Sequence, residues 1–94
     1  MSEDLEKRRK RLRFRSWHRG TKENDLLMGR FADAQLDSFD SAELDLYEAI
    51  LELSDPDLMG WISGQQPLPP ELDNPVMRRI LTFDHAAANL EAGQ

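Results

Sequence analysis

A chain of 94 residues has room for one small domain with one core, and its composition of 39% hydrophobic and 32% charged residues is typical of a soluble globular protein. It contains no cysteine, which excludes disulfides, thiol nucleophiles and cysteine metal sites, and no apolar run approaches the roughly 20 residues that span a bilayer. The amino terminus has neither the apolar segment of a secretory signal nor the uninterrupted basic pattern of a transit peptide, so we expect a cytoplasmic, bacterial protein.

The net charge of -6 conceals two oppositely charged parts. Residues 1–30 carry ten of the twelve lysines and arginines, whereas residues 31–94 carry two of them against thirteen acids. Such a chain can be steered toward a charged partner, or it can neutralise itself by folding the two parts together.

The first expected helix runs from about Glu3 to His18, where Lys, Arg and Leu favour helix and neither Gly nor Pro interrupts. Because only Gly adopts the left-handed conformation without steric cost, we expect Gly20 at the C′ position of this helix. Thr21 is then expected to cap a second helix, residues 22–34. The apolar stripe of this second helix is expected to comprise Leu26, Leu27, Phe31 and Ala34.

The third helix, expected over Ser41 to Leu53, has the clearest start signal and is the expected centre of the core. Asp40 and Glu43 have the spacing of a capping box, and Phe39 can pack on Leu44 as a hydrophobic staple. The expected apolar face comprises Leu44, Leu46, Tyr47, Ile50, Leu51 and Leu53, and Asp45, Glu48 and Glu52 lie opposite.

A short fourth helix is expected from Pro56 to Ser63, with Asp55 as N-cap, Pro56 at N1 and Gly64 as its end. The proline-containing stretch 65–72 is expected to be a loop. The residues of the fourth helix that we expect to be buried are Leu58, Trp61 and Ile62.

The fifth helix repeats the start signal with Asn74 as cap, and we expect it to run from Pro75 to about Asn89. No segment alternates with period two, so the sequence predicts an all-α, single-domain five-helix bundle with its core at about residues 5–90 and flexible ends at 1–4 and 90–94. The apolar positions expected on the fifth helix are Val76, Ile80, Phe83, Ala87 and Leu90.

The basic run from Lys7 to Lys22 holds nine cations and no acid, with Phe14 and Trp17 interleaved. It could follow a phosphate backbone and stack on bases, but the acidic pI of about 4.8 and the lack of a nucleic-acid-binding signature favour a solvated helix face or a protein partner. No nucleophile stands beside a histidine and the carboxylates lack metal-loop spacing, so we expect no catalytic or metal site.

The stretch Arg19-Gly20-Thr21-Lys22-Glu23 divides the basic part from the acidic part. A helix-turn-helix corner explains the glycine, yet it leaves unexplained the two opposite charges held beside a basic helix, which we expect to be exposed. A residue without Cβ also lets the backbone of a partner approach closely.

Three features of this chain resemble the FAD assembly factor (SdhE) family, called succinate dehydrogenase assembly factor 2 in mitochondria. They are Arg19-Gly20-x-x-Glu23 followed by a Leu-rich helix, the segment Asp55-Pro56-Asp57-Leu58-x-x-Trp61, and a proline-containing loop before a final helix. The resemblance covers about residues 12–83 and implies a small five-helix bundle.

The resemblance also implies a non-catalytic helper that binds the flavoprotein subunit of succinate dehydrogenase, or of fumarate reductase, and promotes its covalent flavinylation. FAD would be handled in the partner and not held stably by this chain, which we expect to be a monomer when free. The alternative is a small regulatory, antitoxin-like protein that binds nucleic acid or another protein through the basic helix. The implied partner-binding residues are Arg11, Arg15, His18, Arg19, Gly20, Lys22 and Glu23.

Overall fold

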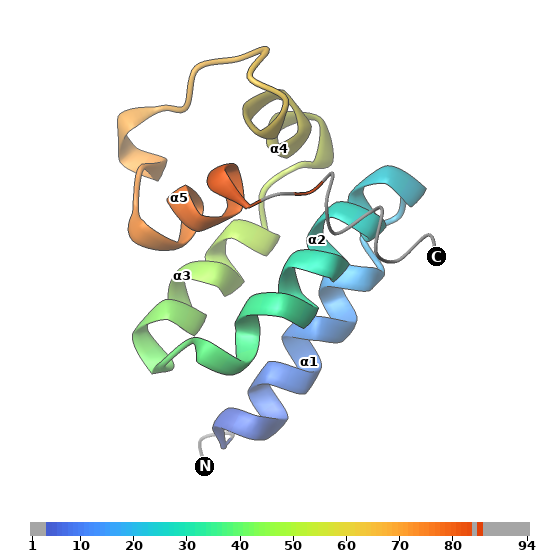
Figure 1. The fold of residues 1–94 in the computed structure, drawn as a ribbon, viewed down its shortest axis with the longest axis vertical. Coiled ribbons are helices and arrows are strands. Elements are labelled where there is room, and N and C mark those ends of the chain that lie inside the picture. The colour runs from blue at the N-terminus through green and yellow to red at the C-terminus, as the bar shows by residue number, and fades with distance from the viewer. Residues whose placement is uncertain (1–3, 84, 86–94) are drawn as a thin grey trace.

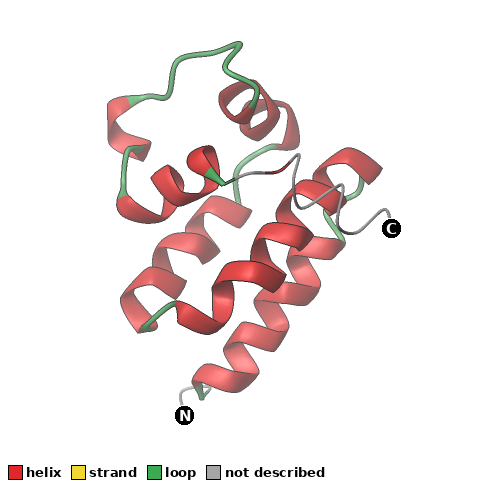
Figure 2. Cartoon of the chain, viewed as in Figure 1, coloured by secondary structure: helices red, strands yellow, loops and turns green. Residues whose placement is uncertain are grey.

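The computed structural model describes residues 4–83 and residue 85, and within them the chain is helical with no strand. The described residues form five α-helices, whose arrangement Figure 1 shows, and Figure 2 shows the loops that join them, with a long connection between α4 and α5. The predicted all-α five-helix bundle is confirmed. In chain order the elements are α1 (Leu5–Trp17), α2 (Lys22–Gln35), the 3-10 helix η1 (Leu36–Ser38), α3 (Ser41–Leu51), α4 (Asp55–Ile62), the 3-10 helix η2 (Pro70–Leu72) and α5 (Pro75–Thr82).

The α1 and α2 helices form an antiparallel pair (Figure 1), and α3 also packs against α1. The α5 helix packs on α3 and contacts α4, which lies near the end of α3. Every helix contributes to one core. Its fully buried side chains include Leu12, Phe31, Tyr47, Leu58 and Ile80.

Three of the predicted helix starts are confirmed. The Thr21 and Asn74 side chains accept hydrogen bonds from the first turns of α2 and α5. Asp40 and Glu43 form a complete capping box at the start of α3, and Phe39 beside it is fully buried. These caps satisfy backbone donors that would otherwise be left unpaired at each helix start.

The predicted start of α4 is wrong by one residue. Ser54 is the N-cap, since its hydroxyl accepts from the amide of Asp57, and Asp55 is already the first helical residue. Pro56 therefore lies at the second helical position, where an amide donor is also unneeded. This shift frees the Asp55 side chain for a different contact.

The predicted stripe of α2 is only partly correct. Phe31 is buried as expected, but Leu27 is half-buried and Ala34 is exposed. Met28 and Ala32 are fully buried instead, because the face of α2 that meets the core lies one residue further along the helix. The predicted and the observed positions are both apolar, so the periodicity of the sequence alone could not show which of them face the core.

Three helices are shorter than predicted. The α1 helix begins at Leu5, after the N-cap Asp4, and ends at Trp17. The α3 helix ends at Leu51, and α5 ends at Thr82 because Phe83 has an extended backbone. Phe83 still packs against the core, half-buried. The predicted continuation of α5 through Ala87 and Leu90 lies outside the described residues. None of the described helices is both long and apolar enough to cross a membrane.

Candidate functional site

The corner between α1 and α2 is built around Gly20. Its φ is +117°, a region that residues with a Cβ rarely adopt, so the glycine expected at this bend is required by the backbone. The C-cap of α1 is His18, which places Gly20 two residues beyond the cap instead of at the predicted C′ position. Among the described residues, no heavy atom other than those of its chain neighbours lies within 4 Å of a Cβ built on Gly20, so this corner is open.

One carboxylate holds the backbone of the corner. Oδ1 of Asp25 accepts from the amide of Arg19 at 2.5 Å and from the amide of Gly20 at 3.2 Å. Asp25 lies in the first turn of α2, where a negative charge is also favoured by the helix dipole. The α2 helix therefore fixes the conformation of the bend that precedes it.

The Arg19 side chain points into the fold and is 7% exposed, so the expectation that both charges of the corner are exposed is wrong for this residue. Its Nε donates to Oδ1 of Asp55 at 2.8 Å, and its two terminal nitrogens donate to the carbonyls of Leu51 and Leu53 at 2.7 Å each. Arg19 thus joins the end of α1 to the α3–α4 connection. The planar guanidinium suits this task because it donates in several fixed directions at once.

The side chains that the corner presents outward are those of Lys22 and Glu23. Both are exposed in the first turn of α2, and neither has a side-chain hydrogen bond or ion pair with another described residue. The exposure expected for Glu23 is confirmed. An open pocket of about 530 Å³ adjoins Lys22 and is lined by Trp17, His18, Gly20, Thr21, Lys22, Asp25 and Leu26.

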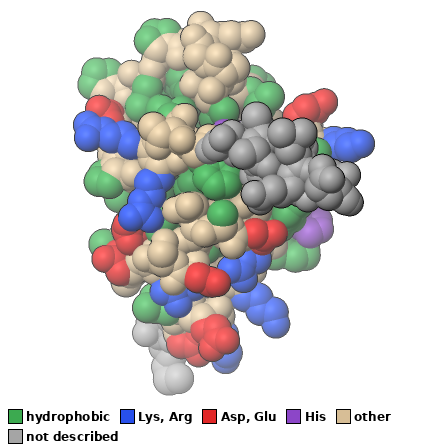
Figure 3. All heavy atoms as spheres, viewed as in Figure 1, with side chains coloured by type: hydrophobic (Ala, Val, Ile, Leu, Met, Phe, Trp, Pro, Cys, Tyr) green, Lys and Arg blue, Asp and Glu red, His purple; other side chains and the backbone are tan. Residues whose placement is uncertain are grey.

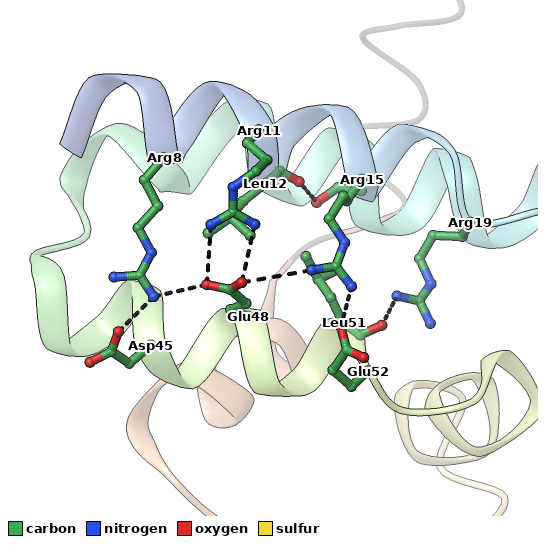
Figure 4. A network of polar contacts seen from close by, with 10 residues as sticks. Arg8, Arg11, Leu12, Arg15, Arg19, Asp45, Glu48, Leu51 and Glu52 are labelled. Atoms are coloured by element: carbon green, nitrogen blue, oxygen red, sulfur yellow. Dashed lines mark hydrogen bonds and ion pairs between the residues drawn. The ribbon is translucent and has the colours of Figure 1, made fainter. Parts of the chain in front are cut away.

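A row of arginines on α1 faces the acids of α3, as Figure 4 shows for Arg8, Arg11 and Arg15. Arg8 reaches Glu48 at 2.9 Å, Arg11 reaches the same carboxylate at 3.1 Å, and Arg15 pairs with Glu52. The two oppositely charged parts of the chain therefore neutralise each other by folding together, one of the two outcomes expected from the sequence. Figure 3 shows charges of both signs interspersed on the surface around these helices.

These pairs shift the pKa values of their members. Hydrogen bonds from Arg11 and then Arg8 hold the pKa of the Glu48 carboxyl below its usual range. The same kind of contact, first to Asp45 and then to Glu48, raises the pKa of Arg8. Arg11 and Arg15, expected to bind a partner, are thus already paired with acids inside the fold, and both also line the outward face of α1.

That outward face carries an aromatic pair. The Phe14 ring is 63% exposed and stacks on the His18 ring, with ring centroids 4.0 Å apart and planes 18° apart. A groove of about 380 Å³ runs beside Phe14. The residues that line it are Lys7, Lys10, Arg11, Phe14 and Arg15.

Sequence reasoning missed three contacts of this site. Asp55 was expected to be a helix cap, yet it accepts from the Arg19 side chain, and Asp25 accepts from the backbone of the corner. Trp17 was grouped with Phe14, but it lies half-buried over Gly29 and donates to Asp33 at 3.3 Å. A glycine inside a helix usually has a packing reason, so Gly29 was the signal that could have located Trp17.

The site is suited to recognition by shape and charge. Among residues 4–83 and 85, no three acidic, histidine or cysteine side chains cluster as metal ligands would. What the corner offers is a backbone that can be approached closely, an exposed acid, and cations and aromatic rings beside it. Such a surface can bind a protein and change which conformation of it is populated.

Comparison with known proteins gives the family. Residues 10–84 match the family described as flavinator of succinate dehydrogenase. The FAD assembly factor SdhE of Acetobacter pasteurianus is 46% identical over 79 residues, which cover 84% of this chain and 72% of that protein.

Mitochondrial proteins are similar too. Succinate dehydrogenase assembly factor 2 of Dictyostelium discoideum is 35% identical over 82% of this chain and 55% of its own length. Succinate dehydrogenase assembly factor 2-A of Drosophila mojavensis is 38% identical over 83% of this chain and 51% of its own length. The chain spans about half the length of these mitochondrial relatives. The matched region contains the whole of the corner, and the chain belongs to the succinate dehydrogenase flavinator family of FAD assembly factors.

Proposed function

We propose that this chain is an assembly factor that binds the flavoprotein subunit of succinate dehydrogenase and promotes the covalent attachment of FAD to it. The observation that carries the proposal is the family match over residues 10–84, which includes a corner whose Gly20 and Glu23 face outward. The flavoprotein subunit of fumarate reductase is a second client that fits the same proposal. Similarity to a bacterial FAD assembly factor supports action in the cytoplasm.

The proposed role is not catalytic. The corner would dock beside the flavin site of the client and favour the conformation in which the histidine and the flavin align, so that the bond forms by the chemistry of the client. FAD would be held by the client, and the free assembly factor would be a monomer. Within the corner, Gly20 would allow close approach and Glu23 would make a charge-assisted contact.

Arg19 has a separate role in this proposal. Its side chain is occupied by Asp55 and two carbonyls, so it would position Gly20 and Glu23 instead of contacting the client itself. An Arg19 variant therefore reports on the fold of the corner as well as on binding. Gly20 and Glu23 are the cleaner test positions.

The experiment co-expresses the flavoprotein subunit with wild-type protein or variants and measures covalent flavin on the denatured subunit. Gly20→Ala is matched by Gly64→Ala, because Gly64 also has a positive φ (+78°) and open space where a Cβ would lie. Glu23→Ala is matched by Glu71→Ala, because Glu71 is exposed and has no side-chain partner among the described residues.

We expect the covalent flavin to fall strongly with Gly20→Ala and Glu23→Ala, and to stay at the wild-type level with both matched controls. Circular dichroism would establish that all four variants are folded. If folded Gly20 and Glu23 variants support as much covalent flavin as wild type, the corner has no part in the reaction. If the subunit carries as much covalent flavin without the wild-type protein as with it, the assembly-factor proposal is wrong.

A further inference from the structure

Phe14 is the most exposed large hydrophobic side chain among the described residues, and the fold does not account for it. At 63% exposure it contributes little to the core, whereas Leu5, the other exposed large hydrophobic residue, is 39% exposed near the start of the helix. Leaving an aromatic ring in water forgoes most of the favourable free energy that its burial would give. A ring in this position is typical of an anchor that becomes buried against a partner.

The His18 side chain holds the Phe14 ring in place. The two rings are stacked, and Nδ1 of His18 lies 2.8 Å from the backbone carbonyl of Phe14. His18 is also the C-cap residue of α1, so its backbone is fixed by the helix end. Because the Phe14 ring is already oriented, little side-chain entropy remains to be lost when a partner covers it.

The aromatic pair is continuous with the corner. His18 lines the pocket beside Gly20 and Lys22, while Phe14 lines the neighbouring groove on α1. One strip of surface therefore runs from the corner over the two rings and along the helix. A partner that docks at the corner is in reach of Phe14 without any movement of the chain.

The charge along this strip is positive. Lys7 and Lys10 line the groove beside Phe14, and their ammonium groups have no ion-pair partner among the residues that the structure describes. Arg11 and Arg15 also line this groove, and they are paired with Glu48 and Glu52. An apolar ring bordered by free ammonium groups fits an acidic protein segment that carries an apolar side chain.

We propose that Phe14, stacked on His18, is the apolar anchor of the docking surface for the flavoprotein subunit, and that Lys7 and Lys10 contact an acidic segment of that subunit. This inference rests on the proposed function and extends its contact surface from the corner onto α1. The anchor limits the dissociation rate, since buried apolar contacts are broken only when the complex separates. The lysines act mainly on the association rate, through steering.

The test measures binding of the 94-residue chain to the purified flavoprotein subunit by biolayer interferometry at several salt concentrations. Phe14→Ala is expected to weaken binding by roughly tenfold or more, mostly through faster dissociation. Leu5→Ala is the matched control on the same helix and is expected to leave the affinity within about twofold of wild type. A Lys7→Gln/Lys10→Gln double variant is expected to associate more slowly and to show a weaker dependence on salt.

Equal affinity of Phe14→Ala and wild type for the subunit would overturn the inference, and so would equal losses in Phe14→Ala and Leu5→Ala. The inference would also be overturned if Phe14→Ala lost binding to a single-stranded oligonucleotide while it still bound the subunit as wild type does. That result would assign the strip to nucleic acid. Covalent flavin separates this inference from the proposed function. If wild type promotes flavinylation and Phe14→Ala does so equally well, only the anchor is wrong, whereas an inactive wild type refutes both.

Discussion

Replacing Arg19 by alanine removes a side chain that joins the residues after α1 to the α3–α4 connection. The guanidinium is 7% exposed, and it contacts the Asp55 carboxylate and the carbonyls of Leu51 and Leu53. Alanine leaves all three acceptors without this donor. The carboxylate of Asp55 is itself only 19% exposed, so water replaces the lost contact poorly.

The loss of stability in Arg19→Ala follows from the Asp55 carboxylate that the substitution leaves unpaired. Removing one partner of a buried charged pair costs about 3–5 kcal/mol, because the remaining charge stays desolvated. Because the Asp55 side chain is partly accessible to water, we expect Arg19→Ala to cost about 3 kcal/mol, at the lower end of this range. For a domain of this size each kcal/mol lowers Tm by about 4–8 °C, so we expect a fall of about 12–24 °C.

Thermal and urea unfolding followed by circular dichroism would measure this loss. Arg19→Lys keeps the charge without the planar arrangement of donors, so it is expected to fall between wild type and Arg19→Ala. Asp55→Asn, which removes the opposite charge but keeps the shape, is expected to cost less than Arg19→Ala because the two carbonyl contacts remain. A Tm for Arg19→Ala within about 3 °C of wild type would show that these contacts do not hold the fold, since about 3 kcal/mol of lost stability would lower it much further.

Two further predictions concern the packing of α1. A Cβ on Gly29 would overlap the ring of Trp17, so Gly29→Ala is expected to destabilise the protein by about 1–3 kcal/mol despite its better helix propensity, and to change the tryptophan fluorescence. A variant as stable as wild type with an unchanged spectrum would contradict that contact. The pKa of Glu48 is lowered in the folded state by Arg11 and Arg8, so the unfolded state binds more protons and the contribution of this carboxylate is lost as pH falls through its folded pKa. Urea unfolding from neutral to acidic pH is expected to show a shallower loss of stability for Glu48→Gln than for wild type, and identical slopes would refute the linkage.

The local signals in the sequence predicted most of the helix starts. Thr21, Asp40 and Asn74 act as caps because a cap depends on one side chain and the amides two or three residues after it. Gly20 was likewise placed at the bend by its own conformational freedom, although its position relative to the cap differs by one residue. Information of this kind is contained in a few adjacent residues.

Contacts between elements could not be predicted in the same way. The sequence assigned Asp55 a capping role that Ser54 performs, and nothing adjacent to Asp55 indicates that Arg19 is its partner. The stripe of α2 was misplaced by one position because Leu27 and Met28 are equally apolar, and only packing against the other helices selects between them. The ion pairs between α1 and α3 were foreseen as a charge balance, but not residue by residue.

The structure divides the Arg-Gly-x-x-Glu motif into two parts with different physical roles. Arg19 is buried and holds the corner from within, whereas Gly20 and Glu23 face solvent and are free to meet a client. A loss of flavinylation in an Arg19 variant therefore has two possible causes, a displaced corner or a lost contact. Restoring the fold separates them: if stabilising substitutions elsewhere recover both Tm and flavinylation in Arg19→Lys, Arg19 acts through the position of the corner. No such recovery is expected for Glu23→Ala, because its exposed carboxylate contributes little to stability and the lost group is the contact itself.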